Sequence, residues 1–349
     1  MKGKSVLFGV LGLLGAGAVA FSAWGVRSLR SLSTTASPPQ ASRPAFVGVQ
    51  QVAFVVNPSK EGAADAVTAL EEACAGRNWP KPIVLETTVE ETGASQAREA
   101  VDAGADVVIA GGGDGTVRSV ALGLMESNVA LGLVPMGTGN LFARHLGIPL
   151  NSAEEAIELA LTGSEHAVDM GLATLYTPEG ETRQEQFLVM GGIGLDAEVI
   201  AGTRDRLKQR VGWLAYSEAG FRLMPGPRQR MHISLNGSPT QSRRVRSILF
   251  ANLGTLPGGI DFIQGARIDD GVLDIVVMSP RSLIGWAGIF AKTLLRHQGA
   301  IGVLDFYKAT QASVSVTEPT ETQMDGDVTG PAMRVDVKVK PHSLVVRSN

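Results

Sequence analysis

The sequence has little of what marks several common classes of protein. Its 349 residues include one cysteine, Cys74, which excludes an internal disulfide framework and a cysteine-rich metal site. The formal net charge is -3 at pH 7, so bulk electrostatics gives no support for nucleic acid as a partner, and we expect none. The histidines have neither the spacing of metal ligands nor that of a catalytic triad. The chain is long enough for two domains with proper cores.

The two commonest phosphate-binding motifs are also missing, but a different glycine-rich turn is present. The stretch "VVIAGGGDGTVRSVALGL", residues 107–124, has neither a GK[ST] ending nor a G-x-G-x-x-G opening. The apolar run from Ala105 to Ala110 predicts a buried parallel strand, and the apolar spacing from Val117 to Met125 predicts a helix. Glycines at such a strand-to-helix turn let backbone approach a ligand, and the helix start suits phosphate oxygens. The turn therefore indicates a phosphate site, although a turn of purely structural use would have the same composition.

Asp114, in the middle of this turn, narrows the choice of ligand. A carboxylate among phosphate-binding amides is unfavourable unless a divalent cation bridges it to the phosphates. The turn therefore favours a nucleotide that binds together with Mg²⁺.

The first residues differ in kind from the rest of the chain. Ser5 to Val26 form an uncharged apolar segment, flanked by two basic residues on each side. Its length predicts a helix that crosses a membrane, whereas "AVA" at 18–20 would also suit cleavage of a signal peptide. Equal flanking charge leaves the orientation open. We expect residues 1–30 to be an uncleaved anchor and 31–46 a flexible linker, with the nucleotide-binding part of the chain on the cytoplasmic side, where nucleotides are available.

From Val49 onward, predicted strands and helices alternate, which indicates an α/β domain with a parallel sheet. Three polar turns, "NPSKEG", "GGGDGT" and "PMGTGN", each follow a predicted strand, at the sheet edge where such domains bind ligands. After Asp169, apolar and polar residues alternate between Asn-Gly, Pro-Gly and Asp-Gly turns, which predicts antiparallel β structure. One predicted helix, Leu283 to His297, interrupts it.

Further motifs follow the three polar turns in a specific order. They are "VDMG" (168–171), "GIGLDAEV" (192–199), "RVGWLAY" (210–216), "ARIDDGVLD" (266–274) and "MDGD" (324–327). With these motifs, the chain from about Val52 to Val346 resembles the diacylglycerol kinase catalytic family of bacterial lipid kinases, to which sphingosine and ceramide kinases are related. No single motif is decisive, but their order together is specific.

The resemblance implies two domains with the active site in the cleft between them. These are an ATP-binding α/β domain at 47–167, completed by the C-terminal segment 334–349, and a lipid-binding β-sandwich domain at 168–333. The residues that would contact the nucleotide are Asn57, Thr88, Gly112, Gly113, Asp114, Gly115, Thr116 and Thr138. Asp270, with the main-chain carbonyls of Arg267 and Val272, would hold a structural Mg²⁺. The same letters also suit an ordinary Asp-Gly turn, and both interpretations can hold together.

Two departures from the family pattern stand out. The third loop of the family usually ends Gly-Thr-x-Asn-Asp, whereas here Asn140 is followed by Leu141. The C-terminal motif is usually Asp-Gly-Glu, whereas here it is Asp-Gly-Asp, which ends at Asp327. Aspartate keeps the charge of glutamate but is one methylene shorter.

Phosphoryl transfer needs a carboxylate that orients or deprotonates the attacking hydroxyl. We expect Asp327 to be this base, with Asp325 beside it and Asp114 as the metal-linked carboxylate. An Asp-Gly hairpin turn without catalytic use is the alternative for "MDGD".

The predicted activity is that of a phosphotransferase that uses ATP and Mg²⁺ on a lipid hydroxyl, most simply a diacylglycerol-like lipid at a membrane surface. An enzyme similar to NAD kinase, which shares the Gly-Gly-Asp-Gly loop, and a non-catalytic relative that binds lipid or nucleotide are the alternatives. The sequence leaves the acceptor lipid and the oligomeric state open.

Overall fold

The computed structural model describes residue 44 and residues 48–194, 228–256, 260–263, 265–280 and 303–349. All of them belong to the compact unit Leu32–Asn349. The predicted N-terminal anchor, the motif "RVGWLAY" and the predicted helix Leu283 to His297 lie outside the described residues. In the described part of the chain, no helix is long and apolar enough to cross a membrane.

The N-terminal part is built on parallel strands, as the alternating pattern predicts. The strands are β1 (Val52–Val56), β2 (Ile83–Glu86), β3 (Val107–Gly112) and β4 (Ala130–Pro135). They pair in the order β4-β3-β1-β2, and every pair is parallel. All positions of β1 and β3 are buried, which is typical of strands covered on both faces.

Each of these strands is followed by a helix, so the carboxyl ends of the strands carry the connecting turns. The helices are α1 (Ala63–Gly76), α2 (Ala94–Asp102), α3 (Asp114–Leu124), α4 (Leu141–His145) and α5 (Ala153–Thr162). α1 packs with α5, and α2 packs with α3. Ser152 begins α5 as an N-cap, because its side chain accepts a hydrogen bond from the Glu155 amide.

The C-terminal part is antiparallel and β-rich, as predicted. Its longer strands are β5 (Ser164–Tyr176), β6 (Thr182–Phe187), β7 (Met190–Ile193), β8 (Gln229–Leu235), β9 (Gln241–Val245), β10 (Ser247–Ala251), β13 (Leu273–Met278), β14 (Leu304–Ala309), β15 (Gln311–Met324) and β16 (Asp327–Ser348). Two short strands, β11 (Thr255–Leu256) and β12 (Ile260–Asp261), pair only with each other. A second apolar core lies within this part, while the core around the parallel strands also includes residues of β5, β10 and β13.

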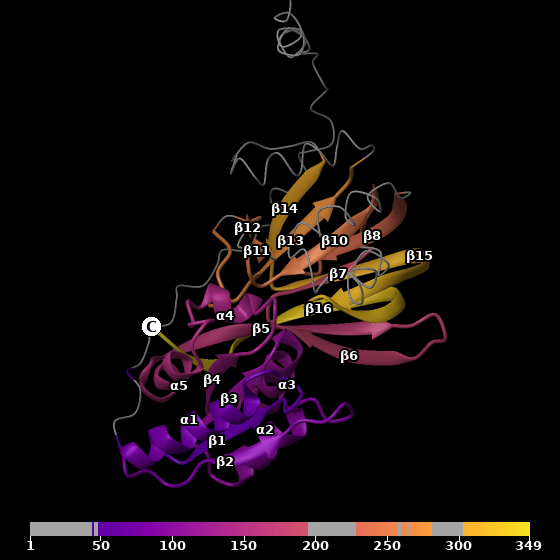
Figure 1. Cartoon of the computed structure of the whole chain (residues 1–349). Coiled ribbons are helices and arrows are strands. Elements are labelled where there is room, and N and C mark those ends of the chain that lie inside the picture. Colours follow the sequence, from indigo (N-terminus) through magenta and orange to yellow (C-terminus); the bar gives the residue numbers. More distant parts are fainter. Residues whose placement is uncertain (1–43, 45–47, 195–227, 257–259, 264, 281–302) are drawn as a thin grey trace, which may run out of the picture. The chain divides into compact units, whose positions relative to one another are not determined.

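β16 belongs to both parts of the sheet (Figure 1). Most of its 22 residues pair antiparallel with β15 and β5, but Val345 and Val346 near its end pair in parallel with β4. The pairing with β5 shifts in register between Lys340 and Leu344. The last residues of β16 therefore extend the parallel part of the sheet, whereas its first residue, Asp327, lies at the hairpin turn with β15.

A buried arginine fastens the end of β16 to the α/β part. One Nη of Arg347 donates to Gln50 Oε1 at 2.8 Å and to the carbonyls of Ala160 and Leu161 at 3.1 Å each. The other Nη lies 3.2 Å from Glu165 Oε1. The carbonyls belong to the last turn of α5, which offers unpaired acceptors that a cation satisfies well.

We predict that Arg347→Met lowers the free energy of unfolding by roughly 3 kcal/mol, because it leaves buried acceptors and a carboxylate without their cation. Arg334→Met is the matched control, since Arg334 pairs with Asp336 on the surface and such a pair contributes about 1 kcal/mol or less. Urea unfolding of both variants measures the difference. Equal losses would show that Arg347 is no more important than a surface arginine.

Candidate functional site

The polar turns that follow the parallel strands meet at one edge of the sheet and are joined through the backbone. The Asn57 amide, just after β1, donates to the Gly111 carbonyl at 2.9 Å, and the Met136 amide, just after β4, donates to the Gly112 carbonyl at 2.8 Å. These bonds continue the parallel ladder past the ends of the strands. The first and third turns are thus both held against the second.

Asn57 after β1 and Thr88 after β2 are both predicted to contact the nucleotide, and the side chain of each accepts hydrogen bonds within its own turn. Asn57 Oδ1 accepts from the Ser59 amide at 3.0 Å and from the Ser59 hydroxyl at 2.7 Å, which closes the first turn. The Thr88 hydroxyl accepts from the Glu91 amide at 3.0 Å in the turn after β2. Thr88 and Thr138 are both exposed at this edge.

Within the central turn, close packing requires glycine at position 112, whereas a Cβ at position 113 would make only an ordinary contact. A Cβ on Gly112 would lie 2.6 Å from the side chain of Thr116, which is buried in the first turn of α3. A Cβ on Gly113 would lie 3.5 Å from the Cα of Gly137 in the third turn. Gly113 precedes α3 with an extended backbone and, as a glycine, has no side chain to cap the helix. The start of α3 thus lies at this edge, where helix amides suit an anion.

Asp114 has a structural partner that its motif did not reveal. Its Oδ1 accepts the Leu141 amide at 2.7 Å, and the amides of Asn140 and Phe142 also stabilise its charged form. Burial is the larger effect and raises the pKa of Asp114. The carboxylate therefore caps the start of α4 and holds the third turn against the second. Its predicted link to a metal ion stays a prediction.

The third turn is closed by Asn140, whose backbone is left-handed with φ 48°. Its side chain accepts from the Gly137 amide at 3.0 Å and donates to the Gly137 carbonyl at 2.7 Å. Leu141, where the family pattern has aspartate, contributes its amide to Asp114. That amide does not depend on the side chain, so the departure at 141 leaves the turn intact.

The motif "MDGD" forms the hairpin turn between β15 and β16. Asp325 and Gly326 both have positive φ, 50° and 85°, and Met324 pairs with Asp327 across the turn. Two central residues of this kind define a type I′ turn, which an Asp-Gly pair favours. The motif is therefore an Asp-Gly hairpin turn, and this geometry does not decide whether either carboxylate has a catalytic role.

The two carboxylates of this turn have very different surroundings. Asp325 accepts three backbone amides, from Leu188 at 2.9 Å, Val189 at 2.8 Å and Met190 at 2.9 Å. Desolvation nevertheless raises the pKa of Asp325 to about 6. Both of its oxygens accept from the backbone that leads into β7, so this side chain has a structural role.

Asp327 points instead toward the central turn, "GGGDGT", which we call the phosphate turn below. Its carboxylate is one-third exposed, and Oδ2 lies 3.7 Å from the place that a Cβ on Gly115 would take. Arg118 on α3 donates to the same oxygen at 2.8 Å and also to the Met324 carbonyl. The hairpin and the first turns of α3 are thus joined through one guanidinium.

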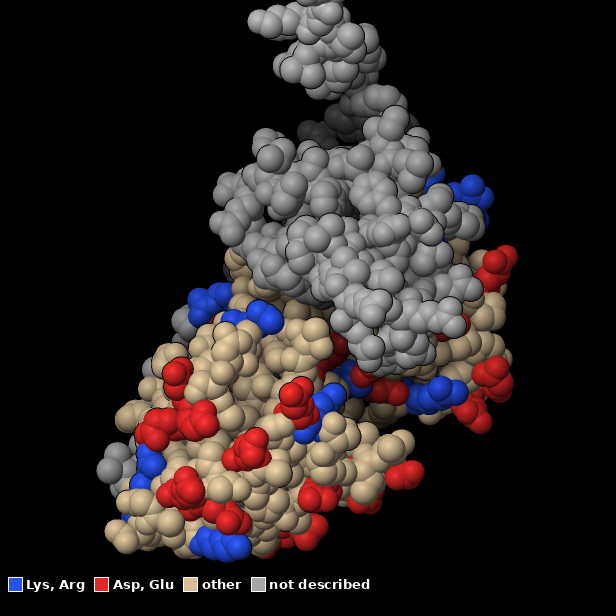
Figure 2. Space-filling model, in the orientation of Figure 1, with Lys and Arg blue, Asp and Glu red and all other residues tan. Residues whose placement is uncertain are grey.

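Sequence reasoning missed Arg118, although one signal was available. Arg118 follows Asp114 by four residues, so both side chains lie on the same face of α3. The same surroundings include Glu185 on β6, whose pKa is raised by burial while the charges of Arg118 and Arg183 lower it. Figure 2 shows acidic and basic side chains next to one another near the middle of the face in view.

The predicted structural metal site does not have the surroundings of a metal. Asp270 is buried, and its two oxygens accept from the Val272 amide at 3.3 Å and from the Lys308 ammonium at 3.0 Å. The Arg267 side chain pairs with Asp269. Within the described ranges, no group of three or more His, Cys, Asp or Glu side chains is arranged to hold a metal ion. The residues as placed do not fit a divalent cation.

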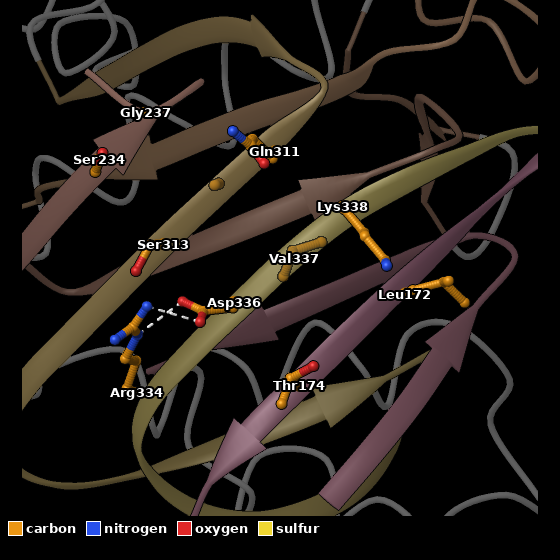
Figure 3. A pocket seen from close by; sticks show the side chains of 11 residues that line it. Leu172, Thr174, Ser234, Gly237, Gln311, Ser313, Arg334, Asp336, Val337 and Lys338 are labelled. Carbon is orange, nitrogen blue, oxygen red and sulfur yellow. Dashed lines mark hydrogen bonds and ion pairs between the residues drawn. The ribbon is translucent and has the colours of Figure 1, made fainter. Parts of the chain in front are cut away.

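A hollow of about 310 Å³ lies elsewhere, on strands β5, β8, β15 and β16 (Figure 3). Arg334 and Asp336 form an ion pair in its wall, and Lys338 lies further along the same strand. None of the predicted site residues lines it. The predicted nucleotide and base residues therefore gather at the strand ends and the β15–β16 turn, and not here.

Comparison with known proteins places this site in a family. The model "Diacylglycerol kinase catalytic domain" matches residues 51–173, and the model "YegS C-terminal NAD kinase beta sandwich-like domain" matches residues 190–348. A protein of Pseudomonas fluorescens Pf-5 named "Probable lipid kinase YegS-like" is 31% identical over 251 residues, which cover 68% of this chain and 76% of the relative.

Two further matches agree with this. The diacylglycerol kinase of Bacillus subtilis strain 168 is 26% identical over 248 residues, which cover 70% of this chain and 78% of the relative. The crystal structure of a diacylglycerol kinase from Bacillus anthracis str. Sterne has a TM-score of 0.64 at 22% identity, and the match covers 87% of this chain and 98% of that one. At this identity the crystal structure shows the fold alone.

The raised pKa of Asp325 predicts how stability depends on pH. Its folded value of about 6 lies above the ordinary 3.8, so between pH 7 and 5 the folded protein takes up a proton that the unfolded chain does not. The contribution of Asp325 to stability should therefore increase by roughly 1 kcal/mol as the pH falls from 7 to 5.

The measurement is the difference in unfolding free energy between the parent and Asp325→Asn, taken at both pH values. Subtraction removes other groups that titrate in this range. A difference that stays constant with pH would contradict the raised pKa.

Proposed function

Because the chain belongs to the diacylglycerol kinase catalytic family, we propose that it transfers the γ-phosphoryl group of ATP to a lipid hydroxyl, with a diacylglycerol-like lipid as acceptor. The observation that carries this proposal is the position of the Asp327 carboxylate. It lies beside Gly115 in the first turn of α3, where the backbone suits phosphate oxygens. A carboxylate next to a phosphate site can orient or deprotonate the hydroxyl that attacks the phosphorus.

In the proposed step, the lipid oxygen forms a bond to the γ-phosphorus while the bond from that phosphorus to the oxygen of the leaving ADP breaks. The proton of the lipid hydroxyl passes to Asp327. Positioning and neutralisation of charge dominate such a reaction. Mg²⁺, bound with ATP, would neutralise part of the phosphate charge. The α3 amides and the glycine backbone of the central turn would hold the phosphates in line with the acceptor.

The geometry favours Asp327 over Asp325 as the base. The two oxygens of Asp325 accept from three backbone amides. These bonds hold the backbone that leads into β7, and turning the carboxylate toward a substrate would break them. Asp327 is partly exposed, and the bond to Arg118 fixes the direction of its carboxylate. A base must come within about 2.6–3.2 Å of the proton that it takes. Arg118 would thus compensate for the shorter side chain by holding it at the phosphate turn.

The N-terminal segment fits the same function. A lipid acceptor lies in a membrane, and the apolar run from Ser5 to Val26 is long enough to hold the enzyme there. We propose that this segment is an uncleaved anchor and that the catalytic part faces the cytoplasm. Processing of the mature chain after Ala20 would refute this part of the proposal.

Transfer of label from γ-labelled ATP tests the function directly. The full chain, with Mg²⁺, is offered dioleoylglycerol in vesicles and NAD in parallel reactions. We expect label in the lipid phase and none in NADP. Label in NADP would favour the alternative similar to NAD kinase, and nucleotide binding without any transfer would favour the non-catalytic alternative.

Substitutions at the hairpin identify the base. We predict that Asp327→Asn lowers kcat on the lipid by about 10²–10⁴-fold, the usual contribution of a general base, with the KM for ATP little changed. Asp327→Glu should keep substantial activity, because it restores the usual family residue. Asp325→Asn is the control for the other assignment. A parent-like kcat in Asp327→Asn together with an inactive, folded Asp325→Asn would move the role to Asp325.

Arg118 should act through Asp327 and not independently of it. We predict that Arg118→Met lowers kcat by about tenfold or more, because Asp327 loses the bond that orients it, while Arg118→Lys loses less. In the Asp327→Asn background, Arg118→Met should have little further effect, since coupled residues are not additive. A full additional loss in the double variant would show that Arg118 has a separate role.

A further inference from the structure

We propose that the ammonium group of Lys308 takes the place of a structural divalent cation at Asp270, so that the β-rich part of this chain needs no metal ion for its stability. This inference is independent of the proposed kinase activity. It concerns buried charges around β13 and β14, and it can be tested without nucleotide or lipid.

Three buried carboxylates lie close together in this region. Asp169 on β5, Asp270 before β13 and Asp274 on β13 are each less than one-tenth exposed. The charge of Asp270 acts on both of the other two carboxylates. Like charges removed from water are costly unless hydrogen-bond donors or cations compensate them.

Backbone amides compensate the first of these carboxylates. Asp169 Oδ1 accepts the His342 amide at 2.8 Å, and Oδ2 accepts the Gly271 amide at 2.7 Å. The His342 Nδ1 lies 3.7 Å from the same carboxylate. These bonds do not reach Asp270 and Asp274, which need another source of positive charge.

Lys308 provides that charge, and the strand register places it. Lys308 on β14 is directly opposite Asp274 on β13, where opposite charges across an antiparallel pair stabilise each other. Its Nζ lies 3.0 Å from Asp270 Oδ2 and 3.5 Å from Asp274 Oδ2. One ammonium thus bridges two buried carboxylates, as a bound cation would.

The same contacts are unsuitable for a divalent cation beside the lysine. Mg²⁺ requires oxygen ligands at about 2.0–2.1 Å in octahedral order, whereas both Asp270 oxygens face N–H donors. A dication at Asp270 would also lie against the ammonium group, and like charges repel. Removal of the lysine charge should therefore expose a place that a dication can fill.

The test uses the full chain without nucleotide, treated with a chelating resin and checked for metal content. We expect the parent to contain no stoichiometric divalent ion and to unfold at the same temperature in EDTA and in millimolar Mg²⁺ or Ca²⁺. Lys308→Met should unfold roughly 5–10 °C lower in EDTA, since the buried carboxylates lose their partner. Millimolar Mg²⁺ or Ca²⁺ should raise its midpoint again. Lys308→Arg, which keeps the charge, should behave like the parent.

Several results would overturn the proposal. These are a bound divalent ion in the parent, a fall in its midpoint in EDTA, a Lys308→Met variant as stable as the parent, and a failure of both cations to restore that variant. If Lys308→Met does not fold, the triple variant Lys308→Met with Asp270→Asn and Asp274→Asn decides. It removes the charge together with both of its partners, so it should fold without metal and should not respond to either cation. A metal requirement in the triple variant would contradict the role of the two carboxylates.

Discussion

The candidate site depends on a single strand that joins the parallel and the antiparallel parts of one sheet. Near its C-terminal end β16 pairs in parallel with β4, and at its start it provides Asp327 in a hairpin with β15. The three polar turns follow the parallel strands of the same sheet, so one continuous sheet carries both the central glycine turn and the Asp327 carboxylate. The Arg118 bond to Asp327 closes this connection directly between α3 and the hairpin.

Three other carboxylates hold neighbouring segments of backbone in place. Asp114 caps α4, Asp325 holds the entry to β7, and Asp169 joins the Gly271 and His342 amides. In each of the three the desolvation cost is partly offset by backbone donors, which fix position without adding a counter-charge. Asp327 differs from them because its carboxylate is one-third exposed and accepts from the side chain of Arg118. The proposed base gains from that exposure, because an acceptor hydroxyl can approach it.

Local patterns predicted the elements of the fold well. The alternation of strands and helices, the three polar turns and the Asp-Gly hairpin all depend on residues close in sequence, where propensity and periodicity apply. The partners of the carboxylates could not be predicted in the same way. Arg118 and Asp327 are 209 residues apart, and Lys308 and Asp270 are 38 residues apart.

The metal prediction shows the limit of motif transfer most clearly. The resemblance of "ARIDDGVLD" to the family motif implies a cation near Asp270, and in the structure the Lys308 ammonium lies 3.0 Å from that carboxylate. The register of β13 against β14 places Lys308 opposite Asp274, which brings it within reach of Asp270. Asp114 makes the same point, because its bond to Leu141 depends on how two turns pack and not on either motif alone.

The central claim is that Asp327 faces the γ-phosphate across the first turn of α3. A crystal structure of the full chain with Mg²⁺ and a non-hydrolysable ATP analogue tests it most directly. The account predicts that the γ-phosphate lies at the α3 amides, with the Asp327 carboxylate directed at the space from which an acceptor hydroxyl must approach. A γ-phosphate bound away from α3, or an Asp327 carboxylate turned away from it while Asp325 faces it, would contradict the account.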